Sequence, residues 1–108
     1  MQYKISKELL NSVWKYNTSD FIINQEDEAI EYENNEILYL NTFYFECKEW
    51  AKDNGFIITS NYKFSLLNYK YDLDLNKPIM IFKHSFDEIQ ATIDACEYIM
   101  ENFLNANI

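Results

Sequence analysis

Three segments of the chain repeat apolar residues at the spacing of an α-helix, and this pattern limits the fold more than any other feature. The segments cover residues 6–15, 41–55 and 85–104. In each one, apolar side chains recur three or four positions apart and so fall on one side of a helix. Short runs of strand-forming residues fill the intervals. We therefore expect an α+β fold in which helices bury one face against a sheet.

The predicted helices carry signals at their ends. Ser6 is a good N-cap for the first helix, and Gly55 stands where a glycine commonly follows a helix C-terminus. Ser85 and Glu88 have the spacing of a capping box at the start of the last helix. These signals set the expected helix boundaries.

Six short strands are expected between the helices, and one has a strict alternation. Residues 67–75 alternate Leu and Tyr with Asn, Lys and Asp, which predicts a strand with one buried face. The order helix, short strands, helix, three strands, helix predicts an antiparallel sheet packed against the two longer helices, in one domain over residues 1–108. The other strands are expected at residues 21–24, 29–33, 37–40, 56–60 and 79–82.

Charge is distributed unevenly along the chain. The net charge is −9, there is no arginine, and eight carboxylates but no basic residue lie between Lys15 and Lys48. A second stretch without lysine or arginine runs from Ser85 to the C-terminus. Such a chain repels nucleic acid and anionic lipid and favours a basic protein surface. We expect the following carboxylates to bind that partner: Glu26, Asp27, Glu28, Glu31, Glu33, Glu36, Asp87, Asp94, Glu97 and Glu101.

Reactive side chains are few. Cys47 and Cys96 lie on the apolar stripes of predicted helices, so we expect buried structural thiols. His84 is the only histidine, and no nucleophile with a recognisable triad accompanies it. Asp72 and Asp74 begin like a calcium loop, but lysines occupy two later positions that such a loop requires. We therefore predict no catalytic residue, no metal ligand and no cofactor.

The second half of the chain resembles a double-stranded-RNA-binding domain in element order, which is helix, three strands, helix. That family places lysines at the start of its last helix to hold phosphates. Here the corresponding residues are Ser85, Phe86, Asp87 and Glu88. Direct nucleic-acid binding is therefore not expected.

Three short stretches resemble a group of small proteins from phages and prophages of low-GC bacteria. They are ISKELL at residues 5–10, CKEWA at 47–51 and ACEYI at 95–99. The group shares an ISKELL start, a CKEWA helix and a terminal ACEWI helix, and Tyr98 stands where it often has tryptophan. Its layout is similar to the helix–sheet–helix phage sandwich domains. The resemblance implies a mobile-element origin and a host-directed role, with no catalytic residues to carry over.

Together these features predict a non-enzymatic, acidic protein-binding accessory protein. We expect a phage-encoded inhibitor that covers a basic surface on a host defence protein, as anti-CRISPR proteins do, or on a nucleic-acid-handling protein. Without an apolar signal segment or membrane helix, its expected location is the host cytoplasm. Two alternatives stay open: an immunity-type antidote to a basic toxin, and a small-molecule-binding domain with a pocket near Trp50 and Tyr69. The oligomeric state is open too, a homodimer included.

Overall fold

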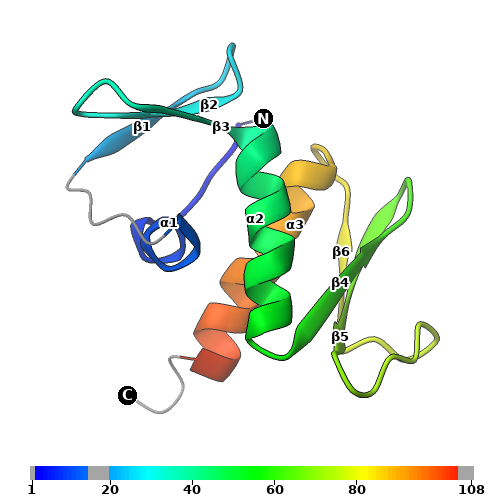
Figure 1. Cartoon of the computed structure of the whole chain (residues 1–108). Coiled ribbons are helices and arrows are strands. Elements are labelled where there is room, and N and C mark those ends of the chain that lie inside the picture. Colours follow the sequence, from blue (N-terminus) through cyan, green and yellow to red (C-terminus); the bar gives the residue numbers. More distant parts are fainter. Residues whose placement is uncertain (1, 15–19, 105–108) are drawn as a thin grey trace.

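The computed structural model describes residues 2–14 and 20–104, and it confirms the α+β class (Figure 1). Lys15, the expected last residue of the first helix, lies outside the described residues. The elements in chain order are α1 (Lys7–Trp14), β1 (Phe21–Asn24), β2 (Ala29–Tyr32), β3 (Ile37–Tyr39), α2 (Leu40–Asp53), β4 (Phe56–Ser60), β5 (Phe64–Tyr69), β6 (Met80–Lys83), α3 (Glu88–Ile99) and a π-helical turn, η1 (Met100–Leu104).

The strands divide into two antiparallel sheets, a division that the sequence does not reveal. Sheet A contains β1, β2 and β3, and sheet B contains β4, β5 and β6, each in chain order. Figure 1 shows α2 and α3 side by side, with sheet A at the N-terminal end of α2 and sheet B along the other side of the helix pair. The molecule measures 43 × 33 × 19 Å. The two sheets therefore present separate outer faces.

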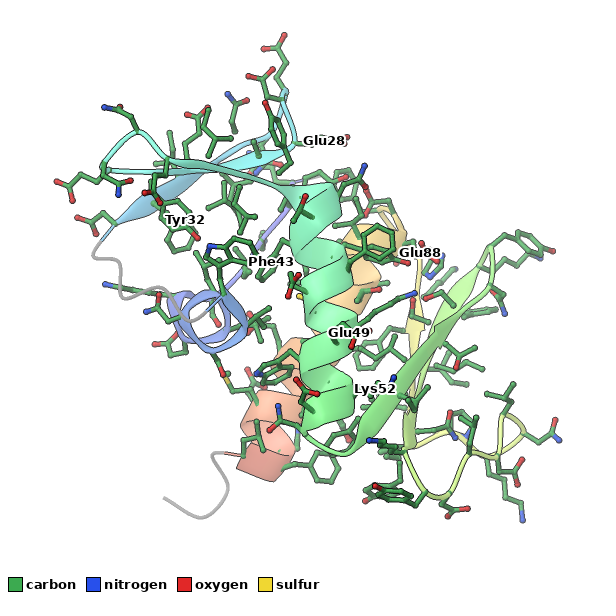
Figure 2. The ribbon with its side chains drawn as sticks, viewed as in Figure 1. Glu28, Tyr32, Phe43, Glu49, Lys52 and Glu88 are labelled. Atoms are coloured by element: carbon green, nitrogen blue, oxygen red, sulfur yellow. The ribbon has the colours of Figure 1, made fainter. Side chains whose placement is uncertain are left out.

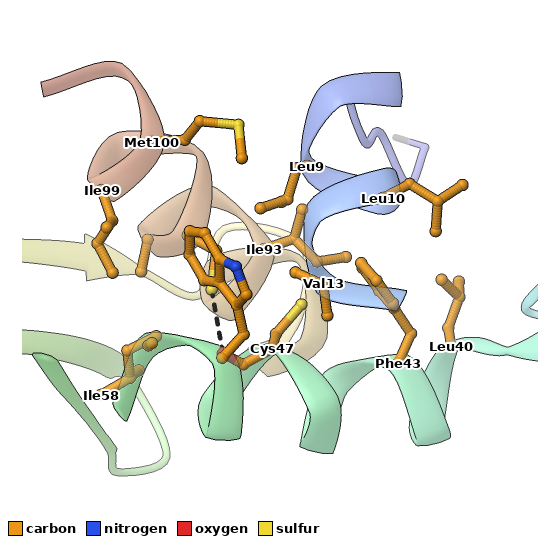
Figure 3. Packing of buried hydrophobic residues seen from close by; sticks show 14 of the residues in the cluster. Leu9, Leu10, Val13, Leu40, Phe43, Cys47, Ile58, Ile93, Ile99 and Met100 are labelled. Atoms are coloured by element: carbon orange, nitrogen blue, oxygen red, sulfur yellow. Dashed lines mark hydrogen bonds between the residues drawn. The ribbon is translucent and has the colours of Figure 1, made fainter. Parts of the chain in front are cut away.

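A continuous apolar core joins the helices to both sheets. Leu9 of α1, Phe43 of α2 and Ile93 of α3 are fully buried where the three helices meet (Figure 3). Sheet A adds Ile30, Tyr32 and Leu38 to this core, and sheet B adds Phe56, Ile58 and Leu67. In Figure 2, Tyr32 points from sheet A toward α1. No helix among the described residues is long and apolar enough to cross a bilayer.

The helix-end predictions at Ser6 and Gly55 are confirmed. The Ser6 hydroxyl accepts a hydrogen bond from the Leu9 amide at 3.1 Å, as an N-cap does. Gly55 follows α2 with a φ of +92°, a conformation that side-chain-bearing residues rarely adopt. α2 begins at Leu40, one residue earlier than predicted, and the Leu40 amide donates to the Glu28 carbonyl at 2.9 Å.

The capping box predicted at Ser85 is wrong by two residues. α3 begins at Glu88, and Asp87 is its N-cap, with Oδ1 accepting a hydrogen bond from the Gln90 amide at 2.8 Å. Aspartate and serine cap helices about equally well, but the carboxylate also interacts with the positive end of the helix dipole. Asp87, and not Ser85, therefore caps α3.

The strand predicted over residues 67–75 is wrong beyond Tyr69. β5 ends at that residue because its partner strand, β4, begins at Phe56, which pairs with Tyr69. Beyond this point Asp74 organises a loop. Its carbonyl accepts a hydrogen bond from Asn68 Nδ2, and its Oδ1 accepts one from the Asn76 amide, both at 2.9 Å. The hydrogen bonds of these Asp and Asn side chains stabilise a turn here, although the period-two pattern predicts that the strand continues.

The segment that precedes α1 is held by glutamine side chains. Gln25 accepts a hydrogen bond from the Tyr3 amide at 2.8 Å and donates one to the Tyr3 carbonyl at 3.1 Å. Gln90 of α3 binds the amide and carbonyl of Lys4 in the same way, at 2.8 and 2.9 Å. Because Gln25 lies in the turn after β1, these pairs tie sheet A to α3.

Candidate functional site

The outer side of sheet A bears large apolar side chains around a carboxylate. The strand register places Ile22 of β1, Glu31 of β2 and Ile37 of β3 in one row across the sheet. Ile22 is 65% exposed, Ile37 is 55% exposed, and Tyr39, two residues further along β3 on the same side, is 58% exposed. We call this side, with Ile22, Glu31, Ile37 and Tyr39, the sheet A face.

The turn between β1 and β2 presents three acidic residues at one end of this face. Asn24 organises the turn, because its Oδ1 accepts the Asp27 amide at 3.0 Å and its Nδ2 donates to the Asp27 and Glu31 carboxylates at 3.1 and 3.0 Å. Glu28 has a φ of +50°, which reverses the chain into β2. Glu26, Asp27 and Glu28 are all exposed. The Asn24 amide is neutral, so its hydrogen bonds add no positive charge to this turn.

The turn between β2 and β3 presents acidic residues at the other end. Asn35 has a φ of +69°, a value that asparagine tolerates better than most residues. Glu33 and Glu36 flank this turn and are exposed. An open depression of about 570 Å³ lies over this end of the sheet, and its lining includes Asp20, Ile22, Glu31, Glu36 and Ile37. Acidic turns thus lie at both strand ends of the sheet A face.

Fold and charge together make this region strongly anionic. Residues 20–39 carry seven carboxylates and no lysine. The six predicted partner-binding acids between residues 26 and 36 all lie on this one sheet and its turns, with Glu31 half-buried and the other five exposed. An apolar centre within a polar, charged rim is the usual anatomy of a protein-binding surface.

Two of the predicted acids on the last helix bind the chain itself. Asp87 accepts hydrogen bonds from the Tyr3 hydroxyl and the Gln90 amide. Glu97 accepts hydrogen bonds from the Ser6 amide at 2.9 Å and the Ser6 hydroxyl at 2.6 Å. Both carboxylates therefore attach the N-terminal segment to α3, a role that the sequence does not show.

The remaining two acids of this set are exposed. Asp94 accepts a hydrogen bond from Gln90 Nε2 at 2.8 Å, and Glu101 lies in η1. They belong to α3 and η1, whereas the other exposed acids of the predicted set belong to sheet A. The structure thus gathers six of the ten predicted residues on sheet A and its turns and leaves the other four on α3, its N-cap and η1.

Hydrogen bonds between polar side chains connect α2 with α3, and connect the strands of sheet B with the residue that follows β6. Tyr44 donates a hydrogen bond to Glu88 at 2.6 Å, and the Ser65 hydroxyl lies 2.9 Å from the Ser60 hydroxyl and 2.8 Å from Nε2 of His84. The sequence does not reveal this serine–histidine contact. Ser65 is 0% exposed, whereas a nucleophile must reach its substrate. The contact satisfies buried polar groups and presents no nucleophile to solvent.

Stability is expected to fall at alkaline pH because of the buried tyrosines. Burial and the hydrogen bond to Glu88 raise the pKa of Tyr44 well above 10, so the folded state favours the neutral phenol. The resulting stabilisation is fully present below about pH 10, the pKa of an unfolded tyrosine, and decreases progressively as the pH rises above this value toward the higher pKa of the folded state. Urea unfolding between about pH 8 and pH 11 should show this loss, and Tyr44→Phe should make the loss of stability with pH smaller.

Tyr71→Phe is the control. Tyr71 is 90% exposed, so this variant should leave the dependence of stability on pH unchanged. Identical profiles for both variants would contradict this expectation.

The two aromatic residues of the predicted small-molecule pocket lie in different surroundings. Trp50 Nε1 donates a hydrogen bond to the Ser12 hydroxyl of α1 at 3.1 Å. Tyr69 packs against Phe56 and Phe103, with ring centroids 5.6 and 6.0 Å away. Trp50 therefore serves the contact between α1 and α2, while Tyr69 closes the end of sheet B against η1.

The cysteines are buried thiols, as predicted. The Cys96 thiol donates a hydrogen bond to the Cys47 carbonyl at 3.5 Å, and burial raises the pKa of the Cys47 thiol. Neither side chain has the exposed, electropositive setting of a reactive cysteine. Within residues 2–14 and 20–104, no three His, Cys, Asp or Glu side chains gather in a way that could hold a metal ion.

No protein-family model matches the chain, and neither a curated protein nor a solved structure matches it. The resemblance to phage proteins therefore stays a prediction.

Proposed function

We propose that this protein is a non-enzymatic binding protein whose sheet A face covers a basic surface on a host protein. The observation behind the proposal is the row of Ile22, Glu31 and Ile37, which lies between two acidic turns in a segment, residues 20–39, that has no lysine. In keeping with the phage resemblance, the proposed role is inhibition of a host defence protein or of a nucleic-acid-handling protein. Cytoplasmic action follows from that role.

The apolar residues and the acidic residues serve different steps of the proposed binding. The acidic rim would speed encounter with a cationic surface and exclude anionic ones. Ile22, Ile37 and Tyr39 would then be buried, and full burial of one such side chain is worth roughly 1.5–3 kcal/mol. Glu31, at the centre of the row, would meet a lysine or arginine of the partner. Because the apolar residues contribute as well as the charges, the proposed complex would be specific and would not depend on charge attraction alone.

Charge reversal on the sheet A face should abolish capture of the partner. The immobilised chain is exposed to a bacterial lysate at about 0.1 M and about 1 M salt, where the Debye lengths are about 10 and 3 Å. We expect a basic protein to be retained at low salt, and Glu31→Lys/Glu36→Lys to weaken its binding at least about 100-fold, because like charges then face each other. Quantitative mass spectrometry of the retained proteins gives the measurement.

The matched control reverses two glutamates on α2. Glu46→Lys/Glu49→Lys changes the net charge equally, both residues are exposed, and Glu49 lies on α2 (Figure 2). This control should capture the partner as the unchanged chain does. Added duplex DNA should release a partner that handles nucleic acid, because both compete for one cationic groove. Equal loss of capture in both double variants would reject the sheet A face as the binding surface.

A further inference from the structure

Sheet B also has an exposed outer side, and the proposed partner leaves it unused. The register aligns Thr59 of β4, Leu66 of β5 and Ile81 of β6 in one row on the side away from α3, and Ile81 is 51% exposed. By strand alternation, Lys83 shares this side with Ile81. A contiguous patch of exposed apolar side chains on a sheet can mark a contact with another molecule, whereas single exposed apolar residues do not.

The loop after β5 extends this surface. Asn68, which alternation places on the same side, donates a hydrogen bond to the Asp74 carbonyl at 2.9 Å and so brings the loop onto that side. Tyr71, Leu73 and Leu75 of the loop are 90%, 55% and 49% exposed. We call the outer side of sheet B, together with residues 70–79, the sheet B face.

The two faces carry opposite charge. Residues 56–85, which form sheet B and its connections, contain four lysines and two aspartates, whereas residues 20–39 contain seven carboxylates and no lysine. Two of the lysines lie beside exposed aromatic rings, with Lys63 Nζ 5.2 Å from the Tyr62 ring and Lys70 Nζ 5.6 Å from the Tyr71 ring. The sheet B face itself holds Lys70, Lys77 and Lys83 with Asp72 and Asp74, so it is apolar and has a small net positive charge in an otherwise acidic protein.

We propose that the sheet B face binds the sheet A face of a second copy of this chain. Contact between two sheet A faces would set carboxylates against carboxylates, and contact between two sheet B faces would set lysines against lysines. Only the mixed contact pairs opposite charges, and it also buries an apolar row on each side. The inference needs only this chain, so it stands independently of a host partner.

Such a contact is heterologous, because it leaves the sheet A face free on one copy and the sheet B face free on the other. The chain then assembles head to tail into a ring or an open filament. Assembly also covers the sheet A face, so a host protein that binds this face would compete with the assembly. Self-association would thereby lower the amount of chain available for that partner.

Sedimentation velocity of the purified chain tests the inference directly. The weight-average mass should rise with protein concentration at about 0.1 M salt and should fall at about 1 M salt, where screening weakens attraction between the faces. Chain that stays monomeric at every concentration in low salt would overturn the proposal. No host protein takes part, so failed capture from a lysate does not affect the result.

Two complementary variants separate this contact from a symmetric dimer. Ile22→Ser/Ile37→Ser disables the sheet A face, and Ile81→Glu/Lys83→Glu disables the sheet B face. Each variant alone should self-associate at least about tenfold more weakly, whereas an equal mixture should form a one-to-one dimer through the two intact faces. Restored association on mixing also shows that both variants are folded.

A matched control and two contrary outcomes complete the test. Glu46→Lys/Glu49→Lys should self-associate as the unchanged chain does. A single variant that still self-associates normally would indicate a symmetric contact and would overturn the proposal. A mixture that stays monomeric, although each variant unfolds in urea at the unchanged midpoint, would overturn it as well.

Discussion

Replacing Phe43 with alanine should lower the free energy of unfolding by about 3–5 kcal/mol, the usual cost of removing a large aromatic side chain from a packed core. Phe43 is 0% exposed and lies where α1, α2 and α3 meet (Figure 3). Because small domains are stable by only about 5–15 kcal/mol, the variant should be close to unfolding at room temperature. Urea unfolding followed by circular dichroism measures the change.

The same helix supplies a matched control. Phe45 lies two residues further along α2 and is 64% exposed, so Phe45→Ala should change the free energy of unfolding by no more than about 0.5 kcal/mol. Similar losses in the two variants would contradict the assignment of Phe43 to the centre of the core.

Replacing Glu97 with alanine should loosen α1 and lower the free energy of unfolding by about 2–3 kcal/mol. The variant loses two hydrogen bonds to a charged acceptor, at 2.9 and 2.6 Å, and leaves the Ser6 amide without that partner. Hydrogen exchange should show faster opening of the α1 amides, while the central amides of α2 change less.

Asp94→Ala is the matched control for this experiment. Asp94 lies three residues before Glu97, is exposed, and accepts one hydrogen bond, from Gln90 Nε2. Its removal should leave α1 exchange unchanged. Equal protection of α1 in both variants would mean that Glu97 does not hold the N-terminal segment, and the carboxylate would again be a candidate for partner binding.

The sequence predicts much of the local structure because each helix and hairpin carries its own signals. Ser6 caps α1 and Gly55 follows α2, since an N-cap hydroxyl and a positive φ are requirements of the helix end itself. The three strands of sheet A were predicted within one residue at each end, because polar turn residues separate short apolar runs. Such features depend on neighbours in the sequence.

Predictions fail where contacts between residues far apart in the sequence determine where a strand ends or which side chains are buried. The alternation in residues 67–75 is a strand pattern, yet β5 ends at Tyr69 because β4 offers no partner beyond Phe56. Asn68 was expected to face water and is 1% exposed, since the loop folds back over it. Pairing partners and loop paths are tertiary properties, and no local period encodes them.

The candidate site was predicted in part. Counting charges identifies the acidic stretch, and the structure gathers the acids of residues 26–36 on sheet A. Charge counting does not reveal that Asp87 and Glu97 hold the N-terminal segment, because their partners, Tyr3 and Ser6, lie more than eighty residues away in the sequence. The alternation of apolar and polar residues along a strand also does not show which side of a sheet other elements leave uncovered. The exposed side chains of Ile22 and Ile37 are therefore not predicted from the sequence.

Carboxylate footprinting shows directly whether the sheet A face contacts the partner. The exposed carboxylates of the free chain and of its complex with the captured protein are coupled to an amine by carbodiimide, and the modified residues are quantified by mass spectrometry. We expect protection of Glu26, Glu31 and Glu36 in the complex and unchanged labelling of Glu46 and Glu49. Protection of the two α2 glutamates instead, or equal labelling of sheet A in both samples, would contradict the proposal.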